Sequence, residues 1–170
     1  MCTYSASSDT RCTGVAYAGC AFAYAPGAAI LGAMGAYLDK AREFHRQAVT
    51  EFDEWKRVRS NDVLIRDAAE KAWGAVTQAA NELIIVFDGG RELPVSSRGR
   101  QSALMEMERE RRQLRSLHLA ERYNAAQIVL HSQAFYEGDY RPADLERYIT
   151  DLVKEYLDDV EQAVTRPPHR

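Results

Sequence analysis

Cysteine is scarce in this chain and confined to one end of it. The three cysteines are Cys2, Cys12 and Cys20, and no histidine lies among them. Their odd number and their gaps exclude a disulfide framework or a structural zinc site as what holds the protein together. The placement favours a reducing, cytoplasmic compartment. The chain also lacks a phosphate-binding glycine loop, a dinucleotide fingerprint, a Gly-x-Ser-x-Gly sequence and a Glu-x-x-His repeat. We therefore expect no metal and no cofactor.

Neither sign of charge dominates. The 22 basic and 25 acidic residues give a net charge of −3, which excludes a uniformly basic nucleic-acid-binding protein. Charge is uneven along the chain, however. Residues 98–122 carry seven Arg and four Glu, whereas residues 131–164 carry nine acids and three bases. We expect these segments to pair within a subunit or across a dimer, and the basic one to meet phosphates only weakly.

The first 33 residues differ from the rest. No charge occurs from Thr13 to Leu38, and the run consists mainly of Ala, Gly and Tyr. Such residues bury little apolar area, and a signal peptide would need a basic start and a Leu-rich centre. We favour a poorly ordered extension or an over-long start, with Met34 as the true first residue. An extra packed helix and a membrane segment remain alternatives, of which we favour the membrane segment least.

Residues 34–165 show a helical pattern of apolar positions. Tyr37, Ala41, Phe44, Ala48, Phe52 and Trp55 recur at steps of three and four, which predicts a helix over about 34–59. A second helix is expected over about 62–87, a loop over 88–99, a third helix from near Arg100, a fourth over about 116–136, and a fifth from Pro142. No Gly or Pro divides the third from the fourth. The sequence predicts an all-α, antiparallel four- to five-helix bundle over 34–165, with a frayed tail at 166–170.

Several residues on these helices have a specific expected role. Trp73 lies in the middle of an apolar stripe and is expected in the core, and Gly74 beside it predicts a close helix–helix crossing. Tyr148 and Tyr156 are expected in the core with their hydroxyls at its rim. His131 stands beside Leu130, Phe135 and Tyr136. We interpret it as a packed residue with one satisfied hydrogen bond, with a functional role as the alternative.

Two segments have sequences that are more specific than a general amphipathic helix pattern. One is Glu70-Lys71-Ala72-Trp73-Gly74-Ala75-Val76, and the other is Leu130-His131-Ser132-Gln133-Ala134-Phe135-Tyr136-Glu137-Gly138. In this order they resemble the archaeal PaREP family, which is grouped with the HEPN-like helical proteins. The resemblance covers about 35–165 and implies a helical bundle, an archaeal cytoplasmic setting and a homodimer. Many HEPN-like proteins are ribonucleases that use an Arg and a His four to six residues apart at a dimer interface, and others bind nucleotides or partners without catalysis.

The segment from Arg109 to His118 is where that ribonuclease pattern fits. His118 would be the acid/base, and Arg111 or Arg112 would hold the scissile phosphate in metal-independent cleavage. At about 100° per residue, Arg111 and His118 lie within roughly 20° of one another on an unbroken helix, which makes Arg111 the better partner there, and with a bend before Ser116 Arg112 becomes possible. The other candidate binding residues are Arg109, Arg115, Arg122, His131 and Tyr136.

Three interpretations of this segment stay open. It is a catalytic pair, an anion- or RNA-binding surface without cleavage, or a solvated face paired with Glu106, Glu108 and Glu110. The leading functional hypothesis is a HEPN-like homodimer that binds RNA or a nucleotide. The alternative is a non-enzymatic module that binds a protein partner through apolar helix faces.

Overall fold

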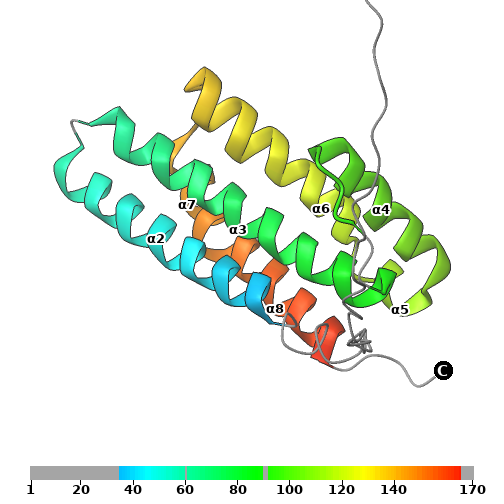
Figure 1. The fold of residues 1–170 in the computed structure, drawn as a ribbon. Helices are drawn as coiled ribbons and strands as arrows, with labels where there is room; N and C mark the ends of the chain where they lie inside the picture. The colour runs from blue at the N-terminus through cyan, green and yellow to red at the C-terminus, as the bar shows by residue number, and fades with distance from the viewer. Residues whose placement is uncertain (1–34, 60, 90–91, 166–170) are drawn as a thin grey trace, which may run out of the picture.

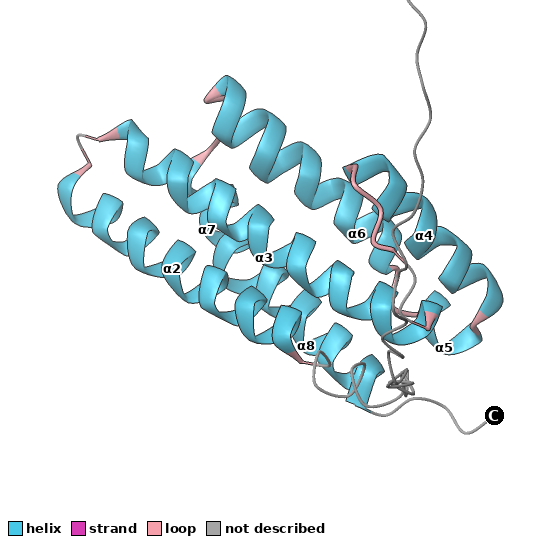
Figure 2. Cartoon of the chain, viewed as in Figure 1, coloured by secondary structure: helices cyan, strands magenta, loops and turns pink. Residues whose placement is uncertain are grey.

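The computed structural model describes residues 35–59, 61–89 and 92–165, and within these ranges every regular element is a helix (Figure 2). The all-α prediction is therefore confirmed for the described part of the chain. The expected extension at 1–33, the tail at 166–170 and all three cysteines lie outside the described residues. In chain order the elements are α2 (Ala36–Val58), α3 (Asp62–Asp88), α4 (Ser97–Glu110), α5 (Arg112–Arg115), α6 (Leu119–Ala126), η1 (Gln127–Glu137), α7 (Pro142–Arg147), η2 (Tyr148–Leu152) and α8 (Val153–Thr165).

Local sequence signals set most of the helix ends. Asn61 caps α3, since its side-chain oxygen accepts a hydrogen bond from the Val63 N–H at 3.0 Å. Gly89 ends the same helix in the left-handed conformation, with φ 71°. Pro142 is the first residue of α7, as expected from its fixed φ. The observed α2 and α3 thus agree with the predicted ranges to within two residues at each end.

The third and fourth helices differ from the prediction. The third begins at Ser97, because the Ser96 hydroxyl caps it by accepting from the Gly99 N–H at 3.1 Å. It ends at Glu110, and Arg111 is extended with φ −121° and ψ 107°. After the short α5, His118 takes a left-handed φ of 51° before α6 begins at Leu119. The chain therefore changes direction twice where the sequence offers no Gly or Pro.

Helix α3 is the centre of the bundle. Figure 1 shows α2 along one side of it and the helix formed by α6 and η1 along another, and α8 also packs against it. Six of its thirteen buried residues are alanines, which let neighbouring backbones approach closely. The buried residues of α3 are Ile65, Ala68, Ala69, Ala72, Trp73, Ala75, Val76, Ala79, Ala80, Asn81, Glu82, Leu83 and Ile84.

The predicted crossing at Gly74 is confirmed. A Cβ atom on Gly74 would lie 3.1 Å from Cδ2 of Phe44, which belongs to α2. Any side chain larger than hydrogen would therefore force the Phe44 ring to move. The low helix propensity of glycine is offset here by the closeness of the two helices. The predicted core position of Trp73 is also confirmed, since only 6% of this residue is exposed.

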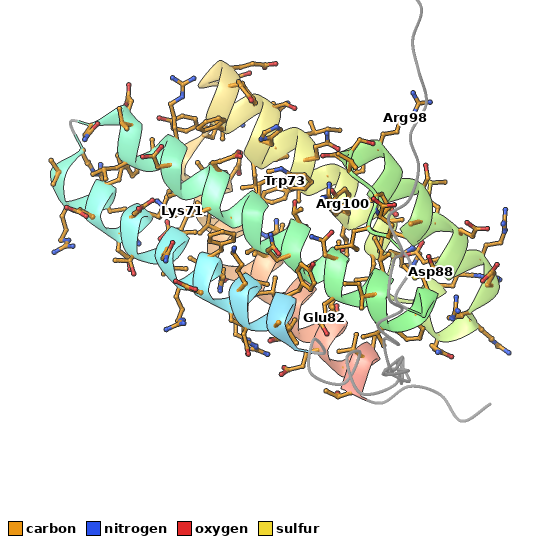
Figure 3. The ribbon with its side chains drawn as sticks, in the orientation of Figure 1. Lys71, Trp73, Glu82, Asp88, Arg98 and Arg100 are labelled. Atoms are coloured by element: carbon orange, nitrogen blue, oxygen red, sulfur yellow. The ribbon has the colours of Figure 1, made fainter. Side chains whose placement is uncertain are left out.

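A buried carboxylate joins α3 to the start of α2. Glu82 is 1% exposed, and its two oxygens accept hydrogen bonds from the Gly35 N–H at 2.7 Å and the Tyr37 N–H at 3.2 Å. Figure 3 shows Glu82 on α3 near the end of α2 where that helix begins. An anion at a helix N-terminus is stabilised by the amide groups and the helix dipole. The buried charge is thus a cap supplied by a neighbouring helix.

We expect Glu82→Gln to lower the free energy of unfolding by about 1–3 kcal/mol, because the amide keeps the shape but offers one acceptor and no charge. Urea unfolding monitored by circular dichroism measures this change. Glu54→Gln, at an exposed position of α2, is the matched control and should change stability by less than about 0.5 kcal/mol. Equal effects of the two substitutions would contradict the capping role.

Candidate functional site

One face of α3 carries three side chains that meet the helix η1. Arg66, Glu70 and Trp73 are spaced by four and three residues, which places them on one side of α3. Figure 3 shows Trp73 between α3 and the helix formed by α6 and η1. Its ring contacts the rings of Tyr123 and His131, with centroids 4.8 Å and 5.9 Å away. The two segments that carry the family resemblance, 61 residues apart at Glu70 and His131, are thus in direct contact.

The π-helical form of η1 gathers its aromatic residues. In a π-helix each carbonyl bonds to the N–H five residues later, so residues five apart lie on the same side. His131 and Tyr136 are five apart, and their ring centroids are 4.9 Å from one another at an interplanar angle of 83°. Phe135 stacks nearly parallel to His131, with centroids 6.2 Å apart. The imidazole therefore stands among three aromatic rings.

His131 is held by a carboxylate. Its Nδ1 lies 2.7 Å from Oε2 of Glu70, and the two side chains are 26% and 39% exposed. An ionised carboxylate only accepts hydrogen bonds, so this contact places a proton on Nδ1 and assigns the tautomer. Nε2 is then the nitrogen available to a ligand. The expectation that His131 is packed with one satisfied hydrogen bond is confirmed, and the partner makes it an oriented acid/base group.

Arg66 fixes the end of η1. Its Nε donates to the Phe135 carbonyl at 2.7 Å and its Nη2 to the Tyr136 carbonyl at 2.6 Å, just before Gly138 leaves the helix with φ 68°. The two carbonyls belong to the last turn, where no amide of η1 itself is left to bond them. The clamp thereby holds the backbone that positions both aromatic rings.

An open groove of about 310 Å³ adjoins this cluster. It is lined by Val63, Arg66, Asp67, Phe135 and Tyr136. Tyr136 and Val63 are 65% and 60% exposed, which is high for residues of this size and apolarity. We call Arg66, Glu70, Trp73, His131, Phe135 and Tyr136 the histidine–glutamate site. Both of its members that the sequence nominated, His131 and Tyr136, lie in it together.

The arginine of the predicted ribonuclease pair has a different set of contacts. Arg111 Nη2 donates to the Phe87 carbonyl at 3.1 Å, and Nη1 lies 3.2 Å from Oε2 of Glu110. Its guanidinium also sits over the Phe87 ring, 5.2 Å from the centroid. Arg111 therefore finishes the C-terminal turn of α3, where a cation is favoured.

The backbone does not provide the unbroken helix on which Arg111 and His118 would share a face. The bends at Arg111 and His118 remove that geometry, and a bend is the condition under which Arg112 is the alternative partner. Arg112 and His118 are both exposed, on α5 and on the turn that follows it. His118 lies near Glu121, whose Oε2 is 3.8 Å from the Nδ1 of His118 and attracts the imidazole ring only when that ring is protonated.

The other arginines that were predicted to bind a ligand each make contacts with different residues. Arg109 is 75% exposed and lies 3.6 Å from Glu106, and Arg115 donates to the carbonyls of Glu108 and Arg109. Arg122 instead turns inward, where Nη1 lies 2.5 Å from Oδ2 of Asp159 on α8. That pair joins the basic segment to the acidic one within the chain, which is one of the two pairings expected. These arginines do not meet the histidine–glutamate site through any contact among the described residues.

Comparison with known proteins yields no relative. No protein-family model matches the chain, and neither a curated protein nor a solved structure matches it. Within the described residues, none of the helices combines the length and the apolar character needed to cross a membrane. The same residues contain no group of three or more His, Cys, Asp or Glu side chains placed to hold a metal ion.

Sequence reasoning missed two members of the site. Glu70 lies in one of the two motif segments but has no predicted role there, and Arg66 has no predicted role either. The available signal was their spacing on α3, since Arg66, Glu70 and Trp73 recur at four and three residues. The spacing does not identify the helix that faces α3. It therefore does not reveal that His131 is the hydrogen-bond partner of Glu70.

We expect the tautomer of His131 to depend on Glu70. In the wild-type protein, ¹⁵N chemical shifts should show the proton on Nδ1, and Glu70→Leu should shift the ring towards the Nε2–H form because the acceptor is gone. Glu70→Gln retains an acceptor oxygen and should keep the Nδ1–H form. An unchanged spectrum in Glu70→Leu would show that the carboxylate does not orient the ring.

Proposed function

We propose that the chain is a HEPN-like helical protein similar to the archaeal PaREP family, which acts in the cytoplasm as a homodimer and binds a nucleotide or a short single-stranded stretch of RNA. The histidine–glutamate site is the binding site. The observation that carries the proposal is the 2.7 Å contact between Glu70 and His131, because it joins the two segments on which the family resemblance rests. In its most specific form the function is metal-independent RNA cleavage.

The chemistry of the site suits this role. A histidine whose Nδ1 proton is held by a carboxylate presents Nε2 as a base, and RNA cleavage needs a base to take the proton of a 2′-hydroxyl. Tyr136 and Phe135 supply rings on which a base stacks, and stacking contributes about 1–3 kcal/mol per base. Arg66 Nη1 takes part in neither of the two carbonyl bonds and is the donor for a phosphate oxygen.

Charge limits the form of binding. The groove is lined by one cation, Arg66, and one carboxylate, Asp67, and Glu70 of the histidine–glutamate site lies nearby on α3 as a second carboxylate. A phosphate is attracted only locally, by the guanidinium, and a long polyanion gains little from the rest of the groove. Recognition therefore rests on the base and on the site's aromatic rings.

A second candidate site is the exposed surface of α4 and α5. Arg109, Arg112 and His118 are all exposed there, and Arg112 is the alternative partner of His118 on a bent chain. This surface carries more positive charge than the groove and would bind RNA through phosphates. The exposed Val63 and Tyr136 equally favour a non-enzymatic protein partner, which would cover the groove instead of RNA.

The two histidines separate these candidates. With a fluorescent single-stranded RNA 20-mer as the probe, we expect His131→Asn to lower the cleavage rate by about 10²–10⁴-fold, the usual contribution of a positioned acid or base. His118→Asn should leave the rate within about twofold. Thermal melting of both variants checks that each remains folded.

Each other result has a definite meaning. Loss of cleavage in His118→Asn alone would move the activity to α4 and α5. If the wild-type protein binds the probe without cutting it, Tyr136→Ala should abolish binding while Arg112→Glu should not. A wild-type protein that neither binds nor cuts RNA or mononucleotides would contradict the proposal and leave the protein-partner alternative.

Salt dependence gives an independent measure of the binding surface. Contact with one phosphate through Arg66 predicts a slope of log K against log salt near −0.7, the value per phosphate for a single strand. Binding through Arg109, Arg112 and Arg115 predicts about −2. Fluorescence anisotropy between about 50 and 200 mM salt measures the slope, and the steeper value would contradict binding in the groove.

A further inference from the structure

A chamber of about 70 Å³ lies away from the histidine–glutamate site, between α6 and the helix formed by η2 and α8. Val76 of α3 closes one side, and Ala126, Val153 and Leu152 form much of its apolar wall. Arg122 and Tyr156 also line it. The chamber is therefore apolar along its sides and carries two strong hydrogen-bond donors.

Buried donors without acceptors gather at this chamber. The Tyr156 hydroxyl and Nη2 of Arg122 are both buried and make no hydrogen bond within the described residues. The hydroxyl of Tyr123 is also buried and makes no hydrogen bond within the described residues. Tyr123 lies close enough to Tyr156 for its charge to raise the pKa of Tyr156. Tyr156 and Tyr123 are 2% and 0% exposed. The expectation that the Tyr156 hydroxyl lies at the rim of the core is therefore wrong.

Folded proteins seldom leave such groups unbonded, so two of them in the lining of one chamber, with a third on the neighbouring Tyr123, require an explanation. Every one of them can donate a hydrogen bond, and no nearby protein group accepts from them. What is missing is an oxygen acceptor. Burial, the largest cause, raises the pKa of Tyr156, so its hydroxyl keeps its proton and remains a donor at neutral pH.

The charges around the chamber disfavour an anion. The guanidinium of Arg122 lies over the Tyr156 ring at 5.4 Å, and its Nη1 is already bonded to Asp159 and to the Leu117 carbonyl. Glu108 is a second carboxylate close enough to raise the pKa of Tyr156. One cation thus faces two carboxylates, and a bound carboxylate or phosphate would add to an excess of negative charge.

The chamber lies beside a larger space that is open to solvent. A larger open depression of about 340 Å³ extends between η1 and α7 and is lined partly by Gln133 and Arg141. Tyr148 and Leu152 line both the depression and the chamber, so the two spaces share a wall. The chamber therefore adjoins a space that is open to solvent.

We infer that the chamber binds a small uncharged molecule that carries a carbonyl oxygen on a short aliphatic chain, with that oxygen accepting from Tyr156 and Arg122. An apolar cavity of about 150 Å³ holds benzene, and the chamber has about half that volume, so we expect a ligand smaller than benzene. Amides and ketones of this size combine the neutral acceptor that the donors lack with the apolar surface that the walls favour. This inference is independent of the function proposed for the histidine–glutamate site.

Protein NMR of the full chain tests the inference with four probes. Propionamide and butanone are neutral carbonyl compounds, propionate has nearly the shape of propionamide but carries a charge, and xenon is apolar. We expect propionamide and butanone to cause saturable shift changes at Ala126 and Val153 with dissociation constants in the millimolar range. Propionate should bind at least about tenfold more weakly.

Tyr156→Phe removes the hydroxyl and keeps the ring, so it should weaken propionamide binding by about tenfold, the equivalent of one hydrogen bond. Tyr37→Phe, on α2 and outside the chamber, is the matched control and should not change binding. If Tyr156→Phe fails to fold, Arg122→Lys serves as the second variant, because it keeps a positive charge facing Asp159 but removes the Nη2 donor, and it has the same expected direction.

The remaining outcomes overturn the inference. Binding of xenon alone, or equal binding of propionamide by the wild type and Tyr156→Phe, would show an apolar cavity without a polar site. Tighter binding of propionate than of propionamide would show the assigned ligand class to be wrong. No shift change with any probe up to about 100 mM would show that only water fills the chamber.

Discussion

The close burial of α3 on several sides is the constraint on which the rest of the structure depends. A helix that is covered by α2, α6, η1 and α8 must be narrow, and alanine at six of its thirteen buried positions helps to make it so. At Gly74 the two helices are so close that even a Cβ atom would press against the Phe44 ring. Large side chains then occur on α3 only where a neighbour leaves room. Trp73 is the main example, and its partners are the rings of Tyr123 and His131. The packing of α3 thus determines where the histidine–glutamate site forms.

Tight packing also explains how the helix ends are completed. Glu82 on α3 accepts from the first amides of α2, and Glu108 on α4 accepts from the Ala120 N–H at the start of α6. Arg66 and Arg111 donate to the last carbonyls of η1 and α3. In each case a neighbouring element supplies a charge of the sign that the helix dipole favours. Several arginines and glutamates that look like a solvated face in the sequence are therefore caps between elements.

This use of charge separates what the sequence could predict from what it could not. The periodicity of Tyr37 to Trp55, the cap at Asn61 and the proline at 142 are local signals, and the helices they predict agree with the structure. The bends at Arg111 and His118 depend on contacts with distant residues, such as the Phe87 carbonyl and Glu108, and no local signal marks them. The geometry expected for Arg111 and His118 failed for this reason. His131 and Tyr136 were nominated correctly as neighbours on one helix, but Glu70 and Arg66 require the facing helix to be known.

The π-helical course of η1 links the packing to the chemistry of the site. In an ordinary α-helix, residues five apart are separated by about 140° around the axis, so His131 and Tyr136 would not face the same groove. Five-residue bonding removes that separation and brings the two rings to 4.9 Å. The wider helix is held at its end by the two bonds from Arg66 and at its middle by the bond from Glu70, both of which come from α3. Arg66 and Glu70 therefore act on the site by maintaining this backbone as well as through their own charges.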